Sequence, residues 1–174
     1  MDEGNLQRVR ARTLEMVANG EPAREVLIYL VREAETLSAG AAVCSILLLD
    51  GDGLLRDGAS PGLPADYLAA IDGLKPDPAI GTCARAAATA TVVITLDMLG
   101  DAGWQELRHL PLALGLLAAW SVPIIGKGGR VLGTFGTYFR EQRGPRPDER
   151  TFVESLAEIA TMVVERDPCD STVA

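Results

Sequence analysis

Positive charge is scarce in this 174-residue sequence. Sixteen Lys and Arg stand against 24 Asp and Glu, so the formal net charge is −8. A nucleic-acid interface needs a basic patch, and an anionic membrane surface attracts polybasic segments. We therefore expect neither nucleic acid nor a membrane surface as a partner.

Long hydrophobic runs are also missing. The longest apolar stretch, residues 110–125, contains Pro111, Ser121 and Pro123. It falls short of the ~20 residues that a membrane-spanning helix needs. The N-terminus has no apolar signal core. These features predict a cytoplasmic protein.

Metal ligands are few and scattered. His109 is the one histidine, and Cys44, Cys83 and Cys169 lie far apart with no C-x-x-C pair or zinc spacing. We expect no metal and no cofactor. Cys44 alternates with Ile46 along a β-rich run, which predicts a core residue.

The most informative stretch is residues 117–139, where two β-rich runs flank four turn residues, 126–129. This pattern predicts a hairpin. If Ile125 pairs with Arg130, one face is bulky and the other small. The bulky face pairs Trp120 with Phe135, Val122 with Gly133 and Ile124 with Val131; the small face pairs Ala119 with Gly136, Ser121 with Thr134 and Pro123 with Leu132. Helices should cover the bulky face. The small face leaves room for a ligand, or for larger side chains from a loop above it.

Helical periodicity dominates the two ends of the chain. Residues 5–19 carry Leu6, Val9, Leu14 and Val17 near one stripe, and residues 22–38 have a wide apolar face. The last helix begins at Pro147, and its apolar stripe consists of Phe152, Leu156, Ile159 and Val163. Residues 167–174 are expected to form a flexible tail.

Between these ends, the sequence predicts strands at 42–49, 54–59 and 91–95 and short helices at 63–71, 82–90 and 104–110. Strands joined by hairpins, with helices at the chain ends, indicate one α+β domain over residues 1–174 with a mainly antiparallel sheet. The terminal helices should cover the bulky face, and the mid-chain segments the other.

An ordered set of short motifs runs through residues 21–166. It comprises Ser60-Pro61-Gly62-Leu63-Pro64 with Tyr67, then Ile80-Gly81-Thr82-Cys83, Val93-Ile94 with Asp97, Trp104, Gly115-Leu116, Trp120-Ser121 with Pro123-Ile124, and Gly129 with Val131-Leu132-Gly133-Thr134-Phe135. In this order and spacing the chain resembles the GAF domain family, in particular the subgroup often found beside diguanylate cyclase modules.

The resemblance implies a GAF-like antiparallel sheet of about six strands, with terminal helices on one face and a small-molecule pocket on the other. It also implies a homodimer through the terminal helices, which pass a signal to an output domain. Two motifs depart from the subgroup. Ala84-Arg85 replaces the usual Gly-Thr after the cysteine, and Leu117-Ala118-Ala119 replaces Arg-Ala-Cys. The ligand of the subgroup therefore need not be the ligand of this chain.

The candidate ligand contacts lie on the small face and in the segments expected above it. They are Thr82, Cys83, Asp97, Trp104, Ala119, Ser121, Thr134, Gly136 and Tyr138. Cys83, at a predicted helix start, could contact a ligand, act as a low-pKa redox thiolate, or be a small buried hydrophobe. The amides of residues 82–84 could bind an acidic group, while Thr82 could simply cap the helix. Asp97 could be a turn residue and Trp104 a lid over the core.

The favoured function is a non-enzymatic sensory domain that binds an unknown small molecule. A dimerisation or interaction module with a vestigial pocket is the main alternative. Some GAF-fold proteins reduce free methionine sulfoxide, which needs an attacking and a resolving thiol close together, and Cys83 has no such partner in sequence. A bilin photosensor needs an aromatic-rich pocket, and aromatic residues make up 5% of this chain.

Overall fold

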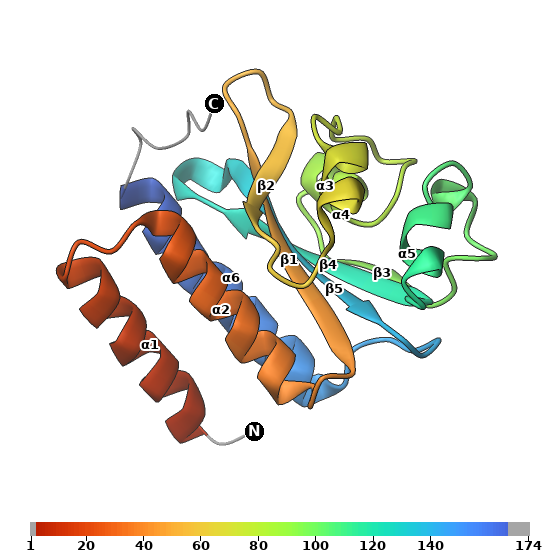
Figure 1. Ribbon diagram of the computed structural model, residues 1–174. Helices are drawn as coiled ribbons and strands as arrows, with labels where there is room; N and C mark the ends of the chain where they lie inside the picture. Colours follow the sequence, from red (N-terminus) through yellow and green to blue (C-terminus); the bar gives the residue numbers. More distant parts are fainter. Residues whose placement is uncertain (1–2, 167–174) are drawn as a thin grey trace.

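A single antiparallel sheet organises the computed structural model, which describes residues 3–166 (Figure 1). Its strands are β1 (Ala42–Leu49), β2 (Leu55–Ala59), β3 (Val93–Thr95), β4 (Ala118–Ile125) and β5 (Val131–Phe139). Their spatial order is β2-β1-β5-β4-β3, and all pairs are antiparallel. The predicted α+β architecture is confirmed.

Among the described residues the sheet has five strands, so the expectation of about six is corrected. In residues 3–166 a sixth partner is reduced to one isolated bridge, in which Leu74 pairs with Leu55 of β2. Gly73 turns the chain there with a φ of 76°. Pro76 and Pro78 follow and supply no backbone N–H, so this segment cannot extend the ladder far.

Helices cover both faces of the sheet (Figure 1). Two long helices, α2 (Ala23–Leu37) and α6 (Pro147–Arg166), lie side by side on one face, and α1 (Glu3–Ala18) packs outside them. Short helices α3 (Ala65–Ile71), α4 (Cys83–Thr89) and α5 (His109–Ala113) lie on the other face. Two 3₁₀ turns, η1 (Ala102–Trp104) and η2 (Lys127–Gly129), complete the elements. No helix in the described part of the chain is both long and apolar enough to cross a membrane.

The stripe predicted for α1 is right for Val9, with Leu6 and Val17 partly buried against the same core, and wrong for Leu14. Val9, Thr13 and Met16 are buried, whereas Leu14 is 48% exposed. The spacing of 9, 13 and 16 still follows one helical face. Thr13 is tolerated there because its hydroxyl donates to the Val9 carbonyl at 2.9 Å.

The β4–β5 hairpin has a register two residues away from the predicted one. Trp120 pairs with Thr137, Ser121 with Gly136, Val122 with Phe135 and Pro123 with Thr134. The turn contains η2, and a bulge at Ile124/Ile125 leaves Leu132 without a partner. A two-residue slip keeps side chains on their predicted faces. Val131 and Leu132 are the exceptions, because the bulge reverses their faces: Leu132 packs in the helix-side core, and Val131 packs against the cluster on the opposite face.

The bulky face carries the larger core. Trp120, Ile124 and Phe135 pack there against α2 and α6. The predicted α6 stripe belongs to the same cluster: Phe152, Leu156, Ile159 and Val163 are each at most 3% exposed. This stripe therefore covers the sheet of its own chain. Cys44 is fully buried in the same core.

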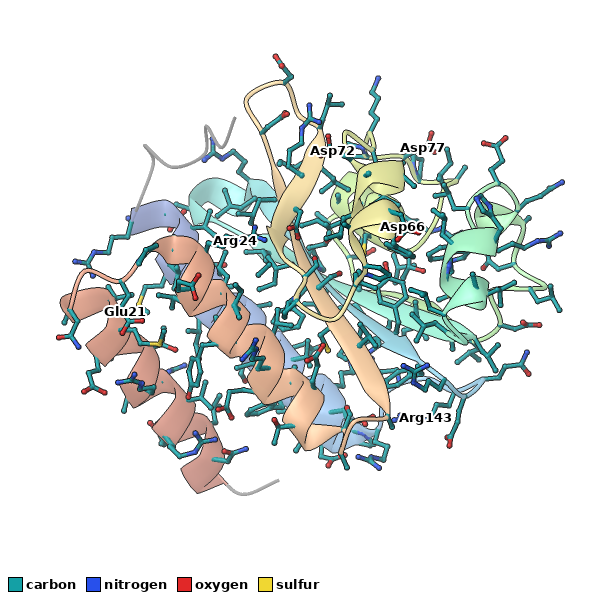
Figure 2. All side chains as sticks on the ribbon, in the orientation of Figure 1. Glu21, Arg24, Asp66, Asp72, Asp77 and Arg143 are labelled. Carbon is teal, nitrogen blue, oxygen red and sulfur yellow. The ribbon has the colours of Figure 1, made fainter. Side chains whose placement is uncertain are left out.

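One buried carboxylate ties the terminal helices together. Glu149 of α6 is 2% exposed and accepts hydrogen bonds from Arg143 at 2.7 and 3.0 Å and from the Arg146 amide at 2.8 Å. Ser38, at the end of α2, donates to it at 3.3 Å. Arg143 lies near the point where α2 gives way to β1 (Figure 2) and stacks over Phe139. Burial opposes ionisation of Glu149, but the bonds from Arg143 and Arg146 outweigh it and hold the Glu149 pKa below its ordinary value.

Candidate functional site

Small hydroxylated side chains meet at the centre of the sheet face opposite α2 and α6. Gly136 of β5 pairs with Ser45 of β1 on one side and with Ser121 of β4 on the other. Thr134 lies two residues along β5, on the same face. All three hydroxyl residues are at most 1% exposed. We call Ser45, Ser121, Thr134 and Gly136 the hydroxyl floor.

Helix α4 rests directly on this floor through the side chain of Cys83. The Cys83 Sγ lies 2.9 Å from the Ser121 Oγ. A Cβ atom added at Gly136 would lie only 2.9 Å from the same sulfur and 3.2 Å from the Ser45 Oγ. Gly136 is therefore needed for this close approach, and the thiol occupies the space above it.

The polar groups of the floor are only partly satisfied. Within residues 3–166, neither the Ser45 Oγ nor the Thr134 Oγ1 has a hydrogen-bond partner, although both atoms are buried. The Thr134 hydroxyl faces the Cys83 thiol, but without the geometry of a hydrogen bond. An unsatisfied buried hydroxyl costs about 1–3 kcal/mol. Such groups in a native interior call for an explanation.

The environment of Cys83 favours the neutral thiol. Burial raises the Cys83 pKa, and the hydroxyls of Ser121, Thr134 and Tyr138 offset this only in part. The redox-thiolate alternative required the opposite shift. Cys44 lies on the other face of the sheet, beside Thr137, and burial raises its pKa to about 12. The two described thiols are thus separated by the sheet, and Cys169 lies outside the described residues.

A polar chain fixes Trp104 beside the start of α4. The indole Nε1 donates to the Thr82 Oγ1 at 2.9 Å, and this hydroxyl lies 3.1 Å from the Thr95 Oγ1. The Thr82 side chain makes no capping bond to the seven-residue α4, so the cap interpretation was wrong. Trp104 is 4% exposed, and its ring meets the edge of Tyr138 with centroids 6.4 Å apart. Tyr67 of α3 meets the same ring at 6.2 Å.

An ion pair holds the segment around η1 to α4. The Arg85 Nη2 lies 3.1 Å from the Asp101 Oδ1, which also accepts the Gly103 amide at 2.8 Å. A side chain at Gly103 would collide with the Arg85 guanidinium. The Gly81 amide in turn donates to the Gly103 carbonyl at 2.8 Å. We call the Arg85–Asp101 pair, with Gly103 between them, the clasp.

Most of the predicted site residues come together in this region. Around the Cys83 sulfur, or one contact away, lie Thr82, Trp104, Ala119, Ser121, Thr134, Gly136 and Tyr138. Asp97 does not join them. It is exposed, and it accepts from the Leu99 amide and from Gln142, both at 3.0 Å. It therefore has the structural role of a turn residue.

Sequence reasoning missed three contributors to the site. Ser45 alternates with Cys44 along β1, so its side chain had to face the opposite side of the sheet from that core cysteine. Tyr67 belongs to the motif that begins at Ser60, but it was not among the candidate ligand contacts. Asp101 carried no sequence signal, because only the packing of η1 brings it to Arg85.

Two of the surface cavities formed by residues 3–166 bear on the function, and both lie away from the Cys83 contact. One, of about 360 Å³, is lined by Val43, Leu63, Leu114, Leu116 and Arg140, among others, on the α3 and α5 side of the sheet. Val43 pairs with Tyr138 across the β1–β5 ladder. This cavity therefore reaches the neighbourhood of Tyr138.

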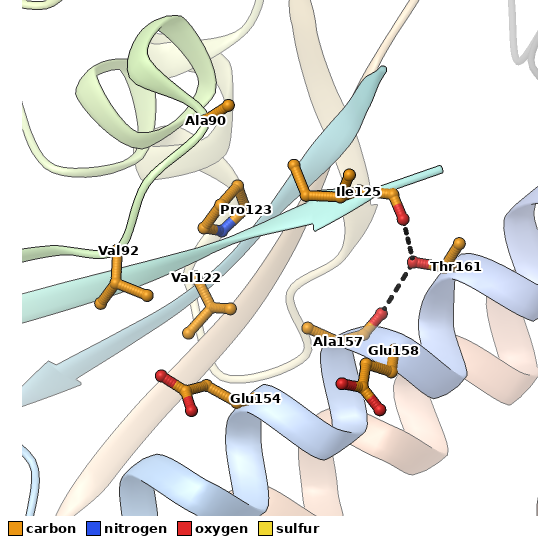
Figure 3. Close-up of a pocket in the computed structure, with 9 residues that line it drawn as sticks. All are labelled: Ala90, Val92, Val122, Pro123, Ile125, Glu154, Ala157, Glu158 and Thr161. Atoms are coloured by element: carbon orange, nitrogen blue, oxygen red, sulfur yellow. Dashed lines mark hydrogen bonds between the residues drawn. The ribbon is translucent and has the colours of Figure 1, made fainter. Parts of the chain in front are cut away.

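The other is a groove of about 530 Å³ between α6 and the outer edge of β4 (Figure 3). Val122, Pro123 and Ile125 line it on the strand, and Glu154 and Glu158 on the helix. Thr161 closes part of this edge by donating to the Ile125 carbonyl at 3.1 Å. Within residues 3–166, no group of three or more His, Cys, Asp or Glu side chains is placed to hold a metal ion.

Comparisons with known proteins agree on the family. Residues 21–165 match the family model of the GAF domain. Over 155 residues the chain is 38% identical to the methyl sulfide methyltransferase-associated sensor of Methanosarcina acetivorans. The match covers 88% of this chain and 15% of that relative, so the chain spans only a small part of the relative's length.

Solved structures show the same fold at lower identity. The GAF domain of a phosphoenolpyruvate-protein phosphotransferase from Coxiella burnetii has a TM-score of 0.75 and 17% identity, with 96% of each chain covered. A type II free methionine-R-sulfoxide reductase from Thermoplasma acidophilum has a TM-score of 0.63 and 15% identity, covering 83% of this chain and 96% of that one. The fold thus accompanies more than one activity.

Proposed function

Because the chain belongs to the GAF domain family, we propose that it is a sensory domain that binds a small molecule against the hydroxyl floor beneath α4. The observation that carries this proposal is the pair of buried hydroxyls, Ser45 and Thr134, that lack a partner within residues 3–166. They stand in an otherwise apolar cluster. A few convergent polar groups in apolar surroundings are typical of small-molecule sites.

The proposed ligand contacts are those that surround the floor. They are Thr82, Cys83, Trp104, Ala119, Ser121, Thr134, Gly136 and Tyr138, joined by Ser45 and Tyr67. The cavity of about 360 Å³ beside Val43 and Leu116 is the proposed entrance, because it approaches Tyr138 from solvent. Asp97 would shape the loop that leads to η1 and make no direct contact with the ligand.

The relative named as a sensor supports a role in signalling. We propose that this chain acts in the cytoplasm as the sensory module of a signalling system. A diguanylate cyclase module is one candidate for the output domain, and this suggestion rests on the sequence pattern alone. Signal transfer would run through the terminal helices, which Glu149 links to each other and to the end of β5.

An interaction module is the second candidate, and the position of Cys83 favours it. The thiol already packs on the floor at 2.9 Å from Ser121, as a filled pocket would require. In either case we propose a homodimer through α1 and α6, where Leu14 and Met162 are 48% and 40% exposed. Catalysis is not part of the proposal, because the described thiols lie on opposite sheet faces.

Native mass spectrometry of the purified protein tests the sensory proposal. We expect a retained small molecule with the wild type and a lower retained fraction with Thr134→Val. Equal retention of the molecule by both proteins would show that the hydroxyl floor is not part of the binding site. Absence of any retained molecule, with a fully folded protein, would favour the interaction module.

A further inference from the structure

The position of Cys83 implies both a mechanism of entry and a class of ligand. We propose that the Cys83 thiol is a displaceable plug on the hydroxyl floor, held down by the clasp, in a site for a small uncharged hydrogen-bonding molecule. This inference rests on the proposed function, which it makes more specific. It is independent of which output the domain controls.

The plug follows from where the floor groups point. The Ser45 Oγ, the Ser121 Oγ and the Cys83 Sγ all lie within 3.4 Å of the position that a Cβ of residue 136 would take. The sulfur is therefore central to the floor. A molecule that takes its place meets the Ser121 hydroxyl, which the thiol would release, and the unpartnered Ser45 hydroxyl. Thr134 supplies a third hydroxyl beside them.

The chemistry of the floor selects an uncharged ligand. Its polar groups are hydroxyls, which both donate and accept. Within residues 3–166, the Ser121 hydroxyl pairs with the Cys83 thiol and the Ser45 and Thr134 hydroxyls have no partner, so none of the three is bonded to an ionised side chain. The nearest cation along α4 is Arg85, whose Nη2 pairs with Asp101 at the start of η1. A buried anion would lack a counter-charge and be costly, so the acidic group considered from the sequence is not expected here.

The clasp controls the plug because both act on α4. Cys83 is the first residue of this helix, and Arg85 stands two residues later. Thr82, just before it, accepts from Trp104. Moving α4 away from the floor, and the thiol with it, would therefore strain or break the Arg85–Asp101 pair. That pair is about a quarter exposed on each side, and partly exposed ion pairs are weak, so a ligand can overcome it.

Site-resolved alkylation of the full chain tests the plug without any ligand. The protein is treated with N-ethylmaleimide, and Cys83 and Cys44 are quantified separately by peptide mass spectrometry. We expect Asp101→Asn to raise the Cys83 rate about fivefold, the factor that corresponds to about 1 kcal/mol, with Cys44 unchanged. Arg85→Gln should act in the same way. Asp57→Asn is the matched control, because it removes the Arg24–Asp57 pair at 3.0 Å on another part of the surface.

The results have separate meanings. If the Cys83 rate stays at the wild-type value in both clasp variants, the clasp does not hold the plug and the proposal falls. If Cys83 and Cys44 accelerate together, the variants unfold globally and the proposed local opening is refuted. If Asp57→Asn accelerates Cys83 alkylation to the same extent, the effect is not specific to the clasp and the proposal falls.

A second measurement tests the ligand class with acetamide and acetate, which have the same shape and differ in charge. Saturation-transfer NMR should show stronger acetamide binding to Cys83→Ala than to the wild type, and no acetate binding. Equal acetate binding, or no gain in Cys83→Ala, would overturn the inference. A retained molecule in native mass spectrometry, together with these negative results, would leave the sensory proposal standing without the plug.

Discussion

Replacing Thr134 by valine should separate binding from stability. The change removes a buried hydroxyl that has no partner within residues 3–166, while keeping a branched side chain of similar size on β5. Leaving a hydroxyl unsatisfied costs about 1–3 kcal/mol. Removing it should therefore stabilise the fold, by about 1 kcal/mol if the site relaxes in part. For a chain of this size, that raises the melting temperature by about 2–4 °C.

Differential scanning calorimetry measures the shift, and native mass spectrometry of the same sample measures ligand retention. Thr137→Val is the matched control, because Thr137 is three residues along β5, faces the other core and has Cys44 as a partner at 3.6 Å. We expect this control to be neutral or destabilised, with ligand retention unchanged. The reasoning is refuted if Thr134→Val lowers stability by 1 kcal/mol or more, since the hydroxyl would then make a stabilising contact.

Further predictions concern Glu149, Gly136 and the proposed dimer. Glu149→Gln should destabilise the fold by about 3 kcal/mol in urea titrations, because it leaves Arg143 without its buried partner. The folded pKa of Glu149 is lowered, so its contribution to the free energy of unfolding should be full above about pH 5. This contribution should fall as the pH drops through the ordinary value of about 4.3 towards the folded pKa. A difference in unfolding free energy between the wild type and Glu149→Gln that does not change with pH in this range would contradict this. Gly136→Ala should cost about 1–3 kcal/mol by colliding with the Cys83 sulfur, and Cys83→Ala should restore most of the loss in the double variant; additive losses would disprove the contact. Multi-angle light scattering should find a dimer that Leu14→Glu weakens, and a monomer at high micromolar concentration would exclude the dimer.

Much of the site could be predicted because strand alternation is a strong local rule. Once the hairpin was placed, Ser121, Thr134 and Gly136 had to share a face opposite Trp120 and Phe135. A register error of two residues did not disturb that assignment, because the side-chain period is two. Val131 and Leu132 do not follow this rule, since a bulge inserts one residue and reverses the faces of both side chains.

The sequence by itself determined the types of the main elements, the two-faced sheet and the family, because these depend on periodicity and on the order of short motifs. Only the tertiary structure decided the contacts across long sequence separations. It brought Cys83 onto Ser121, 38 residues away, and Arg85 onto Asp101, 16 residues away, and it left Asp97 at the surface. These contacts depend on where α4 and η1 pack above the floor. No local pattern encodes that position, because it is set by the summed packing of both cores against a common sheet.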